Sequence, residues 1–246
     1  MGAYMESAPS PPLHALVACR WSRTVSDDEP ADPALILPDG CVDVVWRGGR
    51  LVVAGPDQRA WRSPMQPGQK IVGIRLRPGV AGAVFDLPAS ELLNSRVPLE
   101  DLVGSRAAAL AERLSEAEDQ EAMFLLIEAS IASGAARGGP DPLVLAAARR
   151  LGFPGSRVDE LAHALGISER QLRRRFHAAV GYGPKTLDRI LRFRRLVSQA
   201  QAVSDGEVDL ARLAADLGYA DQAHMSRDSV RLTGMPPGRL ASLWAS

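Results

Sequence analysis

The stretch LGISERQLRRRFHAAVG, residues 165–181, decides how the second half of the chain folds. Gly166 suits the left-handed backbone that ends one helix, and the Ser168 hydroxyl can cap the next one. Leu172 and Phe176 stand four positions apart, so they share one face of that helix, and four arginines at 170, 173, 174 and 175 lie around them. The stretch therefore predicts a helix, a tight turn and a second helix that is apolar on one side and strongly basic on the other.

The same pattern occurs twice. LAHALG at residues 161–166 returns as LAADLG at residues 213–218, an offset of 52 residues. Each copy leads into a further helical pattern, which reaches a glycine and, three residues later, a proline. A short helix with small alanines, followed by a turn that glycine opens, is typical of a helix-turn-helix. Two copies in tandem are far more specific than one, so we predict two such motifs.

Helical patterns fill the rest of the C-terminal part. We predict helices over residues 142–151, 158–165, 168–180, 184–202, 208–217, 221–232 and 236–245. The result is an all-α domain with two helix-turn-helix motifs joined by a long helix. From Thr186 to Ala202 that joining helix would be roughly 25 Å long.

The N-terminal part has a different texture. Short apolar runs bounded by glycine and proline predict strands over residues 35–37, 42–46, 51–54 and 71–76. Periodic apolar residues then predict helices over residues 80–86, 89–94, 99–114 and 117–132. The first ten residues have the composition of a loose tail. We therefore expect an α+β domain with a small, mostly antiparallel sheet plus helices.

Glycine and proline density marks residues 133–142 as a linker, which separates an N-terminal domain (1–132) from a C-terminal domain (143–246). The charge changes sign close by. The whole chain is neutral, but residues 1–148 carry a net charge of −6 and residues 149–246 carry +6. A one-sided basic segment favours contact with nucleic acid or another anionic surface; the alternative is an arginine-rich face that water simply solvates.

Composition places the chain among ordinary globular proteins. Hydrophobic residues make up 46% of the 246 residues and charged residues 24%. No apolar run approaches the roughly 18 residues that span a membrane, and the N-terminus lacks the pattern of a signal peptide. We therefore expect a cytoplasmic protein. Cys19 and Cys41 fit a reducing compartment; two cysteines exclude a disulfide framework but leave a single bridge open.

The repeated motifs carry a family resemblance. The segments LAHALGISERQLRRRFHAAVGYGPKTL, RILRFRRLVSQA and LAADLGYADQAHMSRDSVRLTGMPPGRL resemble the DNA-binding domain of AraC/XylS transcription regulators, over roughly residues 142–243. The stretch PDGCVDVVW…GPD…GIRLRPG is similar to the N-terminal domain of a subset of AraC-like regulators. The resemblance implies a bacterial transcription factor with two recognition helices and a sensing or dimerisation domain. The second recognition helix departs from the family pattern, because Met225 and Ser229 stand where aromatic residues are usual.

The candidate DNA contacts follow from the helical wheel. With Leu172 and Phe176 turned inward, Arg170 and Arg174 point directly away from the core, where arginine can read guanine. Arg192, on the joining helix, is expected to contact a phosphate and to add about 1 to the salt slope of binding. The full set of candidates is Ser168, Arg170, Gln171, Arg173, Arg174, Arg175, Lys185, Arg192, Gln222, His224, Ser226 and Arg227.

The N-terminal part offers weaker candidates. Trp46, Trp61 and Arg75 are candidates for lining a small-molecule pocket, although such residues on strands more often belong to the core and its rim. No metal site or cofactor is expected, because the four histidines do not cluster with the cysteines. We expect double-stranded DNA as the main partner, with a small-molecule effector, RNA polymerase and a second copy of the chain as further candidates.

Three functions remain open on the sequence alone. The first is a sequence-specific transcription regulator without enzymatic activity, which inserts two recognition helices into successive major-groove segments. The second is a DNA-binding module fused to a repair-type enzyme, which would need an activated cysteine. The third is a module whose helices contact protein instead of DNA.

Overall fold

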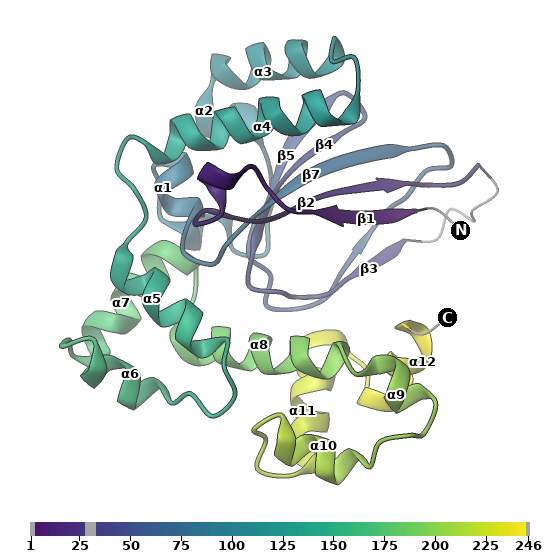
Figure 1. The fold of residues 1–246 in the computed structure, drawn as a ribbon, viewed down its shortest axis with the longest axis vertical. Helices are drawn as coiled ribbons and strands as arrows, with labels where there is room; N and C mark the ends of the chain where they lie inside the picture. The colour runs from purple at the N-terminus through teal and green to yellow at the C-terminus, as the bar shows by residue number, and fades with distance from the viewer. Residues whose placement is uncertain (1–2, 28–32, 245–246) are drawn as a thin grey trace.

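A six-stranded antiparallel sheet forms the centre of the N-terminal unit in the computed structural model, which describes residues 3–27 and 33–244 (Figure 1). The strand order is β1-β2-β7-β4-β5-β8. A separate two-stranded sheet pairs β3 with β6. The strands are β1 (Tyr4–Ser7), β2 (Val17–Thr24), β3 (Ala34–Ile36), β4 (Val42–Arg47), β5 (Arg50–Ala54), β6 (Trp61–Ser63), β7 (Lys70–Leu76) and β8 (Arg96–Pro98).

A tight hairpin fixes the register between β4 and β5. Gly48 and Gly49 both have positive φ, at 56° and 76°, which a two-residue turn between antiparallel strands requires. Alternation then sends Val44 of β4 and its partner Ile74 of β7 to the same face, where both are buried.

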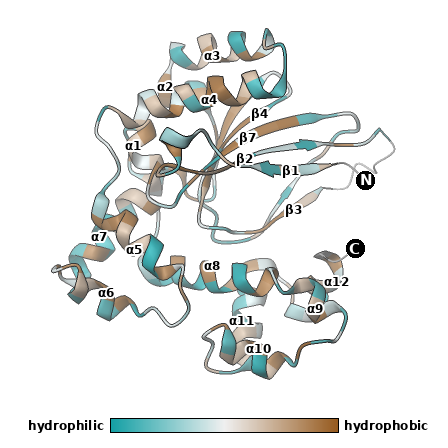
Figure 2. Ribbon diagram, viewed as in Figure 1, coloured by the Kyte–Doolittle hydropathy of each residue, from teal (hydrophilic) through white to brown (hydrophobic). Residues whose placement is uncertain are grey.

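Helices cover that buried face of the sheet (Figure 1). They are α1 (Ala81–Phe85), α2 (Leu99–Val103), α3 (Ser105–Ser115) and α4 (Gln120–Ala135), and the 3-10 turns η1 (Pro11–Leu13) and η2 (Ala89–Leu92) complete the unit. Figure 2 shows that apolar residues concentrate on α4 and on the central strands. The opposite face is more polar, and a small apolar cluster of Val25, Met65 and Ile71 lies on it.

The C-terminal unit is helical, and α8 runs beneath the sheet unit with α5 to α7 at one end and α9 to α12 at the other (Figure 1). Its helices are α5 (Pro142–Leu151), α6 (Val158–Ala164), α7 (Glu169–Val180), α8 (Pro184–Val197), α9 (Ala200–Ser204), α10 (Leu210–Asp216), α11 (Gln222–Thr233) and α12 (Pro237–Trp244). One continuous apolar cluster extends from Val144 of α5 to Leu240 of α12. The predicted class, an α+β unit followed by an all-α unit, is confirmed.

Several predicted boundaries are wrong. The predicted loose tail is wrong over Tyr4–Ser7, because β1 pairs there with β2; residues 1–2 of that tail lie outside the described residues. The predicted helix over 99–114 is broken at Gly104, whose backbone has a positive φ of 60°. The joining helix ends at Val197, and α9 follows as a separate short helix.

Other differences concern segments whose sequence carries little helix or strand pattern. Strand β2 was not predicted, because polar residues interrupt its apolar ones, and β6 and β8 were not predicted, because each has only three residues. Helix α4 continues to Ala135, into the segment predicted as a linker. Both cysteines are free. No helix in the described parts of the chain combines the length and the apolar character needed to cross a membrane.

Candidate nucleic-acid interface

The first helix-turn-helix consists of α6, a turn and α7. Gly166 has φ 66°, which lets the chain reverse between the two helices. Ser168 then caps α7: its Oγ accepts a hydrogen bond from the Gln171 amide at 3.2 Å, and Gln171 Oε1 accepts one from the Ser168 amide at 2.9 Å. This reciprocal capping box fixes the start of α7 and occupies both side chains.

Helix α7 has one fully buried face. Leu172 and Phe176 have no exposed surface. Three arginines, Arg170, Arg173 and Arg174, lie on the exposed side, and none has a hydrogen bond or ion pair to another described residue. Because guanidinium groups that lack a protein partner keep all their donors available, this face can bind an anionic or hydrogen-bonding partner.

Arg175 differs from its neighbours. Its Nη1 lies 2.6 Å from Oδ2 of Asp141, and its side chain is 40% exposed. Asp141 is also the N-cap of α5, where its other carboxylate oxygen accepts from the amides of Leu143 and Val144. Arg175 therefore connects α7 to the segment through which the chain enters the helical unit.

Helix α8 uses most of its charged residues within the protein. Lys185 is exposed at the start of the helix. Arg192, by contrast, donates to the carbonyl of Gly218 at 3.1 Å and lies over the Tyr219 ring at 5.0 Å. Its Nη2 is 3.5 Å from Asp188 and 3.8 Å from Asp228. These contacts hold the turn before α11 against the joining helix.

Asp228 is not among the residues predicted from the sequence, yet it lies at the centre of these contacts. Only 8% of its side chain is exposed, and Arg189 Nε lies 3.1 Å from its Oδ1. His224 Nε2 is 3.7 Å from Oδ2, and the His224 ring meets Tyr219 edge-on. The signal was present in the spacing: Asp228 is three residues after Met225 and four before Leu232, both buried, so it faces inward with them.

The corresponding helix of the second motif, α11, presents fewer donors. Gln222 and Arg227 are exposed, whereas His224 and Ser226 are partly buried. Met225 is fully buried, in the place that Leu172 has in α7. Ser229 is fully buried as well, and its Oγ donates to the Met235 carbonyl at 2.7 Å. The hydroxyl is thus satisfied inside the core, so Ser229 does not leave the motif with an unpaired polar group.

The structure does not bring Trp46, Trp61 and Arg75 together. Trp46 is buried on the helix-covered face of the sheet. Trp61 belongs to the small sheet and is 45% exposed, with the Arg96 guanidinium 5.0 Å from the centre of its ring. Arg75 lies on the opposite face of the main sheet from Trp46, since it is paired with Asp43. The three side chains share no common surface.

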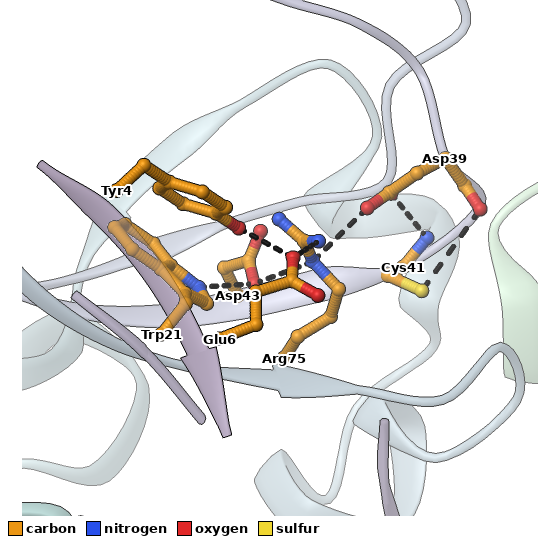
Figure 3. Close-up of polar contacts among 7 residues, drawn as sticks. All are labelled: Tyr4, Glu6, Trp21, Asp39, Cys41, Asp43 and Arg75. Atoms are coloured by element: carbon orange, nitrogen blue, oxygen red, sulfur yellow. Dashed lines mark hydrogen bonds and ion pairs between the residues drawn. The ribbon is translucent and has the colours of Figure 1, made fainter. Parts of the chain in front are cut away.

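Arg75 is instead the centre of a polar cluster (Figure 3). It contacts three carboxylates: Nε lies 3.0 Å from Asp39 and 3.2 Å from Asp43, and Nη1 lies 3.2 Å from Glu6. Trp21 donates to Asp43 at 3.0 Å. Burial raises the pKa of Asp43, against the lowering effect of Arg75. Burial lowers the pKa of Arg75, but Asp43 and Asp39 more than offset it, so its pKa is raised overall and its charge is permanent.

The thiols flank this cluster. Burial raises the pKa of Cys19 to about 11, with Glu6 and Asp43 adding to the effect and Arg75 opposing it. Burial also raises the pKa of Cys41 well above its ordinary value. In the described parts of the chain, no group of three or more His, Cys, Asp or Glu side chains is arranged to hold a metal ion.

Comparison with known proteins adds two domain matches. Residues 161–242 match the family model of a helix-turn-helix domain, and residues 5–98 match that of a domain of unknown function (DUF6597). The helix-turn-helix match covers α6 to α12 almost completely.

Curated relatives agree with the helix-turn-helix match. A Streptomyces lividans protein named as an AraC-like transcription regulator is 35% identical over 109 residues, which is 43% of this chain and 35% of that protein. A Streptomyces antibioticus protein of the same name is 37% identical over 81 residues, 33% of this chain and 26% of that protein. The chain thus spans about a third of the length of these relatives or less.

Solved structures of ToxT from Vibrio cholerae align over nearly the entire chain. An apo variant of ToxT is 10% identical with a TM-score of 0.44, covering 99% of this chain and 97% of that one. A second ToxT structure is 9% identical with a TM-score of 0.41, covering 99% and 98%.

Proposed function

We propose that the protein is an AraC-like transcription regulator that binds specific double-stranded DNA, because residues 161–242 match a helix-turn-helix family model and two curated relatives are named as AraC-like transcription regulators. The observation that carries the proposal is the exposed face of α7. Arg170, Arg173 and Arg174 lie there without partners among the described residues, on a helix whose other face is locked into a core. A rigid helix with free arginines is suited to the major groove, where arginine binds guanine O6 and N7.

The roles within α7 follow from its contacts. Arg170 and Arg174, which point away from the buried face, read bases, and Arg173 contacts a base or an adjacent phosphate. Arg175, tied to Asp141, lies at the rim and contacts a phosphate at most. Ser168 and Gln171 hold the start of the helix, where their capping box leaves little freedom to pair with a base.

The second motif makes a smaller contribution. Gln222 and Arg227 are its base-reading candidates, because glutamine pairs with adenine and arginine with guanine. His224 and Ser226 are partly buried and contact the phosphate backbone instead. Lys185, exposed at the start of α8, is a further phosphate contact. The two recognition helices enter successive major-groove segments on one side of the duplex.

The test is a selection of duplex DNA from a random library by the purified full chain. The proposal expects an enriched sequence, and binding to it that weakens linearly with the logarithm of salt concentration. Arg174→Ala should cost about 1–3 kcal/mol at the selected site and relax base choice there. Arg113→Ala, which removes an exposed arginine of α3, is the matched control and should leave binding unchanged.

Two outcomes decide against the proposal. If the library yields no enriched sequence, the protein is not a sequence-specific DNA binder. If Arg174→Ala weakens binding to selected and random duplexes equally, α7 binds DNA without reading bases, and the base-reading role of Arg174 is wrong.

A repair-type enzyme is a poorer explanation of the same chain. Such chemistry needs a cysteine with a lowered pKa, since the thiolate is the nucleophile. The pKa values of Cys19 and Cys41 are both raised, which suits structural thiols. We therefore propose a non-enzymatic regulator whose N-terminal unit modulates DNA binding through its contacts with the helical unit; a small-molecule effector, RNA polymerase and a second copy of the chain stay predictions.

A further inference from the structure

One loop of the N-terminal unit reaches both recognition helices. Residues 55–60 connect β5 to β6, and we call them the spacer loop. Near its start, Pro56 packs against Gly181, the residue that ends α7. A methyl group placed on Gly181 would lie 3.0 Å from Cγ of Pro56 and 3.0 Å from the carbonyl oxygen of Ala89. The N-terminal unit is therefore in direct contact with the end of the first recognition helix.

At its other end, the spacer loop contacts the second recognition helix. The amide of Ala60 donates to the Leu232 carbonyl at 2.6 Å. Leu232 lies in the last turn of α11, where carbonyl groups have no partner within the helix. The loop thus satisfies a backbone group that the helix cannot satisfy by itself, which is a reason for the contact to be specific.

The spacer loop is held rigidly in its own unit. Asp57 and Arg96 form a two-pronged ion pair, with distances of 3.0 and 2.6 Å and side chains only 14% and 23% exposed. Asn94, which has φ 54°, accepts from the Gln58 amide at 2.8 Å and donates its own amide to the Pro56 carbonyl at 3.1 Å. A paired arginine and carboxylate with this geometry gives directional restraint as well as energy.

These contacts connect the ends of α7 and α11 through five residues, Pro56 to Ala60, of a loop that cannot easily change shape. Helix α8 also joins the two motifs, and its apolar residues share one cluster with both of them. The spacer loop adds a second connection, which runs through the N-terminal unit and restrains the C-terminal ends of both helices. Because the N-termini of recognition helices enter the groove, the loop at their C-termini leaves the DNA-reading ends open.

We propose that the spacer loop fixes the separation and relative orientation of the two recognition helices, and thereby sets the spacing between the two DNA segments that the protein accepts. This inference rests on the proposed DNA-binding function. Asp57, Asn94 and Arg96 act in it as positioning residues that never touch DNA.

The experiment measures a spacing penalty. The full chain first selects a duplex from a random library, and base pairs are then inserted one at a time between the two protected segments. The spacing penalty is the Kd for the altered duplex divided by the Kd for the selected one. Asp57→Ala and Asn94→Gly should lower the penalty by about 2- to 30-fold, the usual effect of a residue that couples two sites. Asp101→Ala, which removes an exposed carboxylate of α2 that has no hydrogen bond or ion pair to the spacer loop among the described residues, should leave the penalty unchanged.

The use of two variants separates a loosened spacer loop from a failure to fold. Asn94→Gly removes the side-chain bond to Gln58 but keeps a residue that accepts a positive φ, so it loosens the loop without straining it. If Asp57→Ala fails to fold by circular dichroism, Asn94→Gly decides. Equal spacing penalties in Asn94→Gly and the unaltered protein overturn the inference.

A readout without DNA separates this inference from the proposed function. Hydrogen exchange of the Ala60 amide reports its bond to Leu232 directly. We expect Asn94→Gly to speed this exchange, whereas unchanged exchange contradicts the restraining role of the loop. If the library selection yields no sequence, the proposed function fails on that result alone.

Discussion

Residue 176 of α7 and residue 229 of α11 occupy corresponding positions in the two motifs, and both are fully buried. Phe176 fills its position with an aromatic ring in the shared apolar cluster. Ser229 fills its position with a hydroxyl that donates to a carbonyl. Phe176 stabilises its motif mainly by removing apolar surface from water, whereas Ser229 does so by satisfying a buried polar group. The first motif consequently rests on the larger apolar contribution.

Phe176→Ala should lower the free energy of unfolding by about 3–5 kcal/mol, because it leaves a cavity that a packed core fills only partly. Urea unfolding followed by circular dichroism measures this change. Arg174→Ala is the control on the exposed face and should shift the free energy of unfolding by no more than about 0.5 kcal/mol. A small effect of Phe176→Ala would mean that α7 is not anchored by this side chain.

Cys19 should react slowly with alkylating reagents at neutral pH. With its pKa at about 11, roughly 0.1% of the thiol is ionised at pH 8, against roughly 25% for an ordinary cysteine. The rate of iodoacetamide labelling, followed by mass spectrometry, should rise steeply up to about pH 11. Because the pKa is higher in the folded chain than in the unfolded chain, the free energy of unfolding should fall as pH rises from about 8.5 towards 11. Rapid labelling at pH 7 would contradict this.

At the scale of elements, the joining helix α8 uses its arginines to hold neighbouring segments of the helical unit. Arg195 donates to the Gly152 carbonyl beside the first motif, and Arg192 to the Gly218 carbonyl beside the second. Arg195 thus holds the end of α5 against the shared helix, and Arg192 holds the turn between α10 and α11 against it. The charge of α8 is therefore largely used for assembly of the helical unit, while the charge of α7 is left free.

Arg192→Ala tests whether the charge of α8 serves to assemble the helical unit. We expect the free energy of unfolding to fall by about 1–3 kcal/mol, because Asp228 would lose a partner while staying buried. The salt slope of DNA binding should stay the same, since the guanidinium is occupied within the protein. Arg194→Ala, an exposed neighbour on the same helix, should leave unfolding unchanged. A drop of about 1 in the salt slope of Arg192→Ala would instead support the phosphate contact expected from the sequence.

At the scale of the whole molecule, the two units share an apolar contact as well as the spacer loop. Leu35, Leu37 and Leu93 of the N-terminal unit pack against the apolar cluster of the helical unit. Gly181 lies against Pro56 and Ala89 of the N-terminal unit, whereas a methyl group placed on Gly234, its counterpart at the end of α11, would meet no described atom within 4 Å. Both glycines have positive φ, at 93° and 77°.

The two glycines form a matched pair for the contact between the units. Gly234→Ala should cost about 1 kcal/mol of stability from backbone strain alone. Gly181→Ala should cost about 1–3 kcal/mol more, since its methyl group would press on Pro56 and Ala89. Thermal unfolding of the two variants measures the difference. Equal losses would mean that the two units are not packed together at this point.

Much of the fold could be predicted from the sequence, because its signals are local. The capped and periodic pattern of α7 predicted both its start and its buried face, and Gly166 and Gly218 predicted the turns of the two motifs. Strand β2 escaped prediction because polar side chains interrupt its apolar residues and its strand partners, β1 and β7, supply the order that its own pattern lacks. The end of the joining helix was placed too late, since nothing in its composition marks the break after Val197.

The amino-acid sequence alone was enough to predict the two helix-turn-helix motifs, the side of α7 that carries the arginines and the change of charge sign between the two units, because periodicity and composition act over a few neighbouring residues. Which arginines are free and which are engaged became apparent in the folded chain. Arg174 and Arg192 are the same residue type in similar helical patterns, but Arg192 lies beside Tyr219 and Asp228, which are distant in the sequence. An arginine becomes available or unavailable through such distant partners, and a pattern of neighbouring residues does not contain them.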